Sequence, residues 1–136
     1  MDVGGAREFL RQHHRAVIAT FRRGGGLQMC PVLTTVDEEG RAIVSTRETA
    51  VLTKNLRRDP RAHLCVFTDA FFGDWVRVDG TAEIVSLPDA MEPLVDYYRR
   101  VAGEHDDWDD YREAMRKEQR VLVRITIEET GPDVAG

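Results

Sequence analysis

Two short turns that contain glycine, at residues 24–26 and 37–40, limit what this chain can fold into. Runs rich in β-branched and apolar residues surround these turns, and we predict them to be strands at 17–23, 27–36 and 41–46. Connections this short join antiparallel strands, because a parallel pair needs a crossover of a dozen or more residues. The first half of the chain is therefore predicted to be an antiparallel meander. Pro31 places the second strand at an edge or a bulge, since proline cannot donate to a ladder.

The second half of the chain adds three more strands and several helices. Every second residue from 121 to 127 is valine or isoleucine, which predicts a strand with one purely apolar face. The other predicted strands are 62–68 and 75–85, and the predicted helices are 5–14, 50–58, 88–102 and 104–120. We therefore expect one domain, residues 1–136, of the α+β class and mainly β. Its six antiparallel strands would form a closed or nearly closed barrel with flanking helices.

Composition excludes some classes of function. A formal net charge of -5 and a pI near 5.4 argue against nucleic-acid binding, which needs a basic face. No apolar run approaches the ~20 residues of a membrane span, and the first residues do not resemble an export signal. We expect a cytoplasmic protein without a membrane partner. Cys30 and Cys65 lie in apolar strands, where buried thiols are expected rather than a disulfide or a metal site.

The segment 45–61 is basic, although the chain is acidic. It contains five cations and two carboxylates, a local charge of +3: Arg47, Lys54, Arg57, Arg58 and Arg61 against Glu48 and Asp59. The segment leaves a strand, passes the hydroxyls of Thr46, Thr49 and Thr53, and enters a short helix before Pro60. The first amides of a helix have no partner inside the helix, so this junction is a candidate phosphate site. The alternative is that the arginines only stabilise the helix dipole.

Two other features are candidates for binding. Trp75 and Arg77 share the non-core face of a strand, where they would form a dimer interface or stack on a flat ring. Phe71 and Phe72 lie in the loop 69–74, which indicates either a contact surface or packing beneath the loop. The sequence has no Gly-x-Ser-x-Gly, P-loop, Gly-x-Gly-x-x-Gly or Cys-x-x-Cys motif. If the protein is an enzyme, we therefore expect a cofactor to carry the chemistry.

The sequence resembles a known superfamily over residues 9–127. The Asn-Leu-Arg-Arg-Asp-Pro-Arg motif that ends at Arg61, the strand after it and the Val-Arg-Val-Asp-Gly-Thr-Ala segment at 76–82 carry the resemblance. They are similar to the split β-barrel flavin and deazaflavin oxidoreductases, the pyridoxamine-phosphate-oxidase-like proteins. The Gly-Glu-His-Asp-Asp-Trp-Asp-Asp-Tyr run at 103–111 is similar to the actinobacterial branch that uses coenzyme F-420.

The resemblance implies a homodimer with two cofactor sites in grooves between the subunits. In such proteins the cofactor phosphate lies at the strand-to-helix junction and the ring along the second strand, while the partner's fifth-strand region closes the groove. The residues implied to bind the cofactor are Pro31, Val32, Leu33, Thr34, Thr35, Thr46, Arg47, Thr53, Lys54, Asn55, Trp75 and Arg77. No catalytic side chain and no metal ligand is implied.

The implied function is a coenzyme F-420-dependent oxidoreductase that transfers hydride to a small organic substrate. The alternatives are an FMN-binding oxidase or reductase of the same fold, and a flavin- or deazaflavin-binding protein without turnover. Relatives in this branch commonly carry an arginine and a lysine where this chain has Ala50 and Leu52. Either Arg47 and Lys54 substitute for these cations, or the phosphate binds more weakly than in those relatives.

Overall fold

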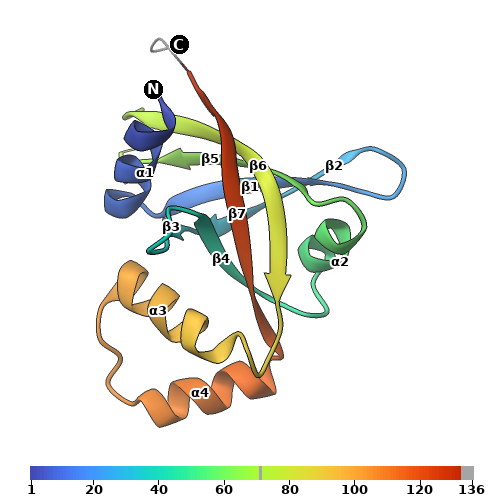
Figure 1. Ribbon diagram of the computed structural model, residues 1–136, viewed down its shortest axis with the longest axis vertical. Coiled ribbons are helices and arrows are strands. Elements are labelled where there is room, and N and C mark those ends of the chain that lie inside the picture. Colours follow the sequence, from blue (N-terminus) through green and yellow to red (C-terminus); the bar gives the residue numbers. More distant parts are fainter. Residues whose placement is uncertain (71, 133–136) are drawn as a thin grey trace.

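The computed structural model describes residues 1–70 and 72–132, and this part of the chain forms one curled antiparallel sheet with flanking helices (Figure 1). The described elements are α1 (Val3–Gln12), β1 (Arg15–Phe21), β2 (Leu27–Leu33), β3 (Thr35–Val36), β4 (Ala42–Arg47), α2 (Val51–Arg58), β5 (Arg61–Phe67), β6 (Trp75–Val85), α3 (Met91–Ala102), α4 (Trp108–Lys117) and β7 (Arg120–Gly131). None of the described helices is long and apolar enough to cross a membrane. The predicted α+β class, mainly β, is confirmed. Phe71 of the predicted aromatic loop lies outside the described residues.

The sheet curls because its two edge strands follow one another in the sequence. The strand order is β2-β1-β5-β6-β7-β4-β3, so β2 and β3 lie at opposite edges, yet only Thr34 separates them along the chain. Two edges joined by one residue must lie close together, and the sheet therefore bends into a nearly closed barrel.

The predicted strand 27–36 is divided, and this corrects the expected six strands to seven within the described residues. At Thr34 the chain changes its neighbour from β1 to β4. The Thr34 backbone N–H donates to the His14 carbonyl at 2.8 Å, while the Thr34 hydroxyl donates to the Ile43 carbonyl at 3.0 Å. Thr34 thereby connects the two halves of the barrel.

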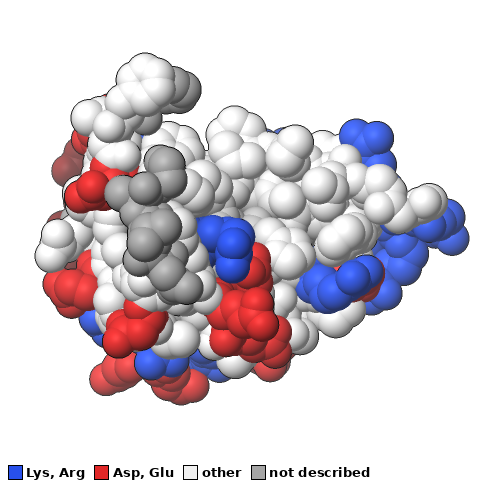
Figure 2. Space-filling view, turned by 90° about the horizontal axis from the view of Figure 1, so that it is seen from above, with Lys and Arg blue, Asp and Glu red and all other residues white. Residues whose placement is uncertain are grey.

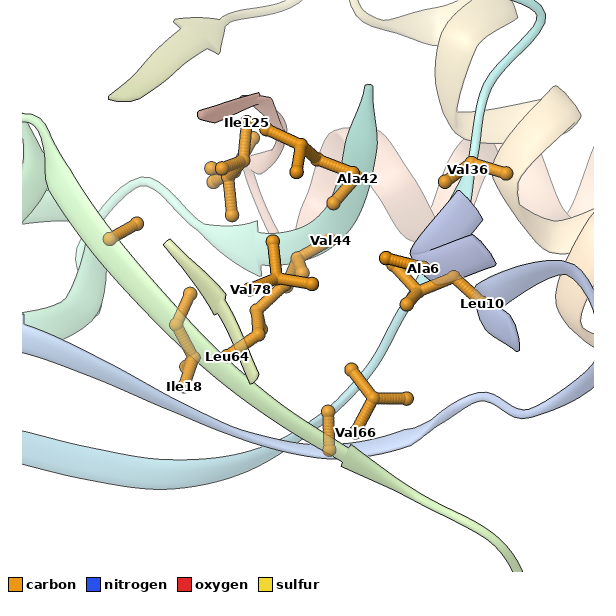
Figure 3. Close-up of a cluster of buried hydrophobic side chains, with 14 of the residues drawn as sticks. Ala6, Leu10, Ile18, Val36, Ala42, Val44, Leu64, Val66, Val78 and Ile125 are labelled. Atoms are coloured by element: carbon orange, nitrogen blue, oxygen red, sulfur yellow. The ribbon is translucent and has the colours of Figure 1, made fainter. Parts of the chain in front are cut away.

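The inside of the barrel is filled by the inward-facing residues of the strands (Figure 3). In β5 and in the first half of β6 every second residue is buried, as a pleated strand with one covered face requires. The predicted apolar face of β7 is confirmed, because Val121, Val123, Ile125 and Ile127 are all buried. Ala6 and Leu10 of α1 are fully buried in the same cluster, so α1 covers one end of the barrel.

Helices α3 and α4 pack outside the barrel, against β4 and β7 (Figure 1). Leu122 and Ile43 point away from the barrel interior and are buried with Leu94, Tyr111 and other side chains of the two helices. The predicted helix 104–120 starts only at Trp108, because Asp107 caps it by accepting a hydrogen bond from the Asp110 amide at 3.1 Å.

A bulge lies in β6 where this strand pairs with β7. The register shifts between Asp79 and Gly80, and Gly80 lies against the backbone of β7. A side chain at residue 80 would overlap the Thr126 carbonyl oxygen and approach Ile125 Cγ2 to 2.8 Å. Only glycine allows β6 and β7 to come this close.

Candidate functional site

An apolar pocket of about 370 Å³ lies beside the end of β2, on the sheet. Pro31, Val32 and Leu33 line it, together with Arg15, Ala16 and Phe67. The first three are residues for which the family resemblance implied contact with a cofactor ring. Sequence reasoning did not identify Arg15 and Phe67, because the register that aligns β1 and β5 with β2 is not visible in a local pattern. The pocket offers apolar walls and one guanidinium group, whose Nε is paired with Asp69 at 3.2 Å.

Trp75 and Arg77 lie on the same face of the sheet as this pocket. The pairing register puts Leu33, Arg15, Phe67 and Trp75 in one row across β2, β1, β5 and β6. Three strand spacings separate Trp75 from Leu33, about 14 Å. Within the chain, Trp75 is therefore at the far side of the face from the β2 end of the pocket.

Arg77 belongs to a polar network in the next rows. Its Nε donates to Asp79 at 2.9 Å, and the other Asp79 oxygen is 2.7 Å from His63 Nδ1. Asp79 fixes the orientation of both side chains. The His63 side chain itself is 37% exposed.

The strand-to-helix junction carries two exposed cations. Arg47 ends β4 and pairs with Glu118 at 3.3 Å, whereas no hydrogen bond or ion pair to the Lys54 side chain is found in the described part of the chain. Helix α2 begins at Val51, and its N-cap residue Ala50 provides no side-chain hydrogen bond. The first-turn amides thus lack a side-chain cap, and they lie near Lys54, as a phosphate site requires. Thr46, which precedes Arg47 in β4, is buried, with 8% exposure.

The other two predicted junction residues are engaged inside the protein. The buried Thr53 hydroxyl donates to the Arg47 carbonyl at 2.5 Å. Asn55 is also buried: its amide donates to the Thr20 hydroxyl at 3.2 Å, and its carbonyl oxygen accepts from Arg58 at 2.8 Å. These bonds attach α2 to β4 and β1.

The remaining positions face the protein interior. Thr34 and Thr35 are buried at the division between β2 and β3. Leu52, where the resemblance led us to expect a cation, is part of the barrel core. In this structure position 52 contributes to packing, so Arg47 and Lys54 are the cations left at the predicted junction.

The curled antiparallel sheet with its flanking helices is a split β-barrel. The sequence profile of the family described as Pyridoxamine 5'-phosphate oxidase matches residues 5–131, and the chain belongs to this family. The resemblance noted from the sequence is confirmed at that level.

Solved structures with the same fold have diverse descriptions. A conserved hypothetical protein, Rv2991, from Mycobacterium tuberculosis superposes with a TM-score of 0.77 at 23% identity, over 100% of this chain and 93% of that one. An F420 reductase gives a TM-score of 0.71 at 17% identity, over 92% of this chain and 94% of that one. A heme binding protein from Mycobacterium smegmatis gives 0.70 at 16% identity, over 94% of this chain and 52% of that one. At these identities the likeness concerns the fold.

Proposed function

We propose that this protein is an oxidoreductase that uses coenzyme F-420 and transfers hydride to a small organic substrate. The observation that carries the proposal is the apolar pocket along Pro31, Val32 and Leu33. It offers a flat ring an apolar wall, and the junction of β4 with α2 offers a phosphate uncapped amides and Lys54. When bound, the deazaflavin supplies the hydride chemistry, while the chain binds and orients it. The shared fold with an F420 reductase supports this choice of cofactor.

We further propose that a second copy of this chain covers the outer face of β2, β1, β5 and β6. Large apolar side chains are exposed on this face, namely Leu27, Met29, Leu33 and Trp75. In Figure 2, carboxylates gather along the left and lower edges and basic side chains toward the right-hand end, whereas the upper middle of the view is largely uncharged. Several large apolar side chains exposed on one face indicate a protein contact. A second copy on this face would also enclose the pocket beside β2.

The proposal is tested by titrating the purified protein with F-420 and, separately, with FMN, following tryptophan fluorescence. Saturable binding of F-420, followed by oxidation of the reduced cofactor with an electron-poor alkene or quinone, supports it. Binding of FMN alone would instead favour the FMN-dependent alternative, and binding without any oxidation would favour a carrier. No saturation by either cofactor below about 1 mM, a binding free energy weaker than about -4 kcal/mol, contradicts the proposal.

Two basic residues on α2 provide a test of the phosphate position. We expect Lys54→Ala to weaken cofactor binding by about ten- to a hundredfold, because one charge-assisted hydrogen bond contributes roughly 1.5–3 kcal/mol. The melting temperature of the Lys54→Ala variant should stay unchanged, because the exposed Lys54 side chain contributes little to packing. Arg58→Ala is the matched variant: it removes the bonds to the Phe21 carbonyl and Asn55 and should lower the melting temperature while preserving affinity. Equal losses of affinity would show that the phosphate lies elsewhere.

A further inference from the structure

The barrel has a gap where β2 and β4 would be expected to pair. In the β3–β4 ladder, Thr35 pairs with Ile43 and Val36 with Ala42. Continuing this register by two residues would pair Leu33 with Ser45. That pair does not form: the β3–β4 pairing ends at Thr35, and Leu33 pairs with Arg15 of β1. We call the gap between Leu33 and Ser45 the seam.

Backbone groups on both sides of the seam point into it. The Thr34 amide bonds to His14 before β1, and successive residues of a strand direct their backbone groups to opposite sides. The Leu33 carbonyl therefore faces away from β1, into the seam. On the other side, Ile43 directs its carbonyl to Thr34, so Ser45, two residues later, directs its N–H into the seam. An acceptor and a donor face each other without a direct bond.

The Tyr97 hydroxyl of α3 lies between them. It donates to the Leu33 carbonyl at 2.8 Å, and the nearby Ser45 backbone acts to lower the Tyr97 pKa, against the larger effect of burial. Burial raises the pKa of Tyr97 to about 12, so the hydroxyl stays protonated and can donate and accept at once. One helical turn later, Arg100 donates to the Val36 carbonyl at 3.4 Å. Helix α3 thus holds the chain on both sides of Thr34.

We propose that Tyr97 is a positioning residue that sets the width of the seam and thereby the separation of the ring-binding and phosphate-binding parts of the cofactor site. This inference rests on the proposed function, because Pro31 to Leu33 lie on one side of the seam and Thr46 and Arg47 on the other. A direct N–H···O bond spans about 2.9 Å, whereas a hydroxyl placed between the two groups makes two bonds in series. The seam is thereby held wider than a ladder and at a fixed width.

The test compares Tyr97→Phe with Tyr111→Phe. Tyr111 is the matched control: its hydroxyl also donates to a backbone carbonyl at 2.8 Å, that of Leu94, and its pKa is also raised to about 12, but its bond stays within the α3–α4 pair. In Tyr97→Phe the ring still keeps Leu33 and Ser45 apart, so the Ser45 N–H loses the nearby Tyr97 oxygen without gaining the Leu33 carbonyl. We expect the Ser45 amide to exchange with solvent about tenfold faster and the Kd for the cofactor to rise about tenfold. Tyr111→Phe should change neither, although both variants lose thermal stability.

The two hypotheses fail in different ways. Wild-type protein that binds neither F-420 nor FMN contradicts the proposed function, and Ser45 exchange alone then decides whether Tyr97 holds the seam. The inference is overturned if Ser45 exchanges at the wild-type rate in Tyr97→Phe. It is also overturned if the wild type binds a cofactor and the two variants bind it with equal affinity.

Discussion

Gly80→Ala is expected to destabilise the fold by about 3 kcal/mol or more, at the upper end for overpacking of a core. The added methyl group would overlap the Thr126 carbonyl oxygen, and a backbone atom of the central β6–β7 pair cannot move away as a side chain can. The strands would have to separate at the bulge. Urea unfolding should show the loss, and the melting temperature should fall by roughly 10 °C.

Gly24→Ala is the control for this prediction. Gly24 lies in the turn between β1 and β2, and a methyl group there meets nothing within 4 Å. Its effect should stay within about 0.5 kcal/mol, as for most surface substitutions. Similar losses for the two variants would mean that residue 80 is not in close contact with β7.

Met29→Glu is expected to convert the proposed dimer to a monomer, with the dimer dissociation constant rising more than about a hundredfold. Met29 is the most exposed large apolar side chain of β2, at 61%, and neighbours Ala19 on the outer face. A carboxylate covered there by a second copy would be buried without a partner. Sedimentation at several concentrations measures the change.

Ala102→Glu adds the same charge at an exposed position near the end of α3, away from this face. It should leave the association unchanged. A wild-type chain that sediments as a monomer, or an Ala102→Glu chain that dissociates equally, would contradict the proposed interface.

The sequence was sufficient to predict most elements, because local signals specify them. Helix α2 was predicted as 50–58 and is Val51–Arg58, and β6 matches 75–85. The first strand ends earlier than predicted: Arg22 already belongs to the turn, where its amide bonds to the Gly26 carbonyl at 2.7 Å. Periodicity and turn residues determine such features within a few positions.

Features that depend on distant partners could not be predicted. Nothing local marks Thr34 as a division, since the apolar pattern continues through it and the cause lies in His14 and Ile43. A threonine or asparagine side chain can hydrogen-bond either a ligand or another group of the protein. The residue type alone therefore does not predict which bond is made. For Asn55 the internal bond is made because β1 brings Thr20 to it, 35 residues away in sequence. Helical periodicity likewise gives no reason to single out Tyr97, whose role depends on two strand ends.

Pro31 has a consequence for how the molecules behave at high concentration. β2 is an edge strand, and exposed edges recruit strands from other molecules and start aggregates. Leu33 and Pro31 direct their backbone groups to the open side, but the Leu33 carbonyl is occupied by Tyr97, and proline has no N–H to offer. An incoming strand would find no continuous row of partners at this end of β2. The barrel thus has an edge that resists extension into a larger sheet.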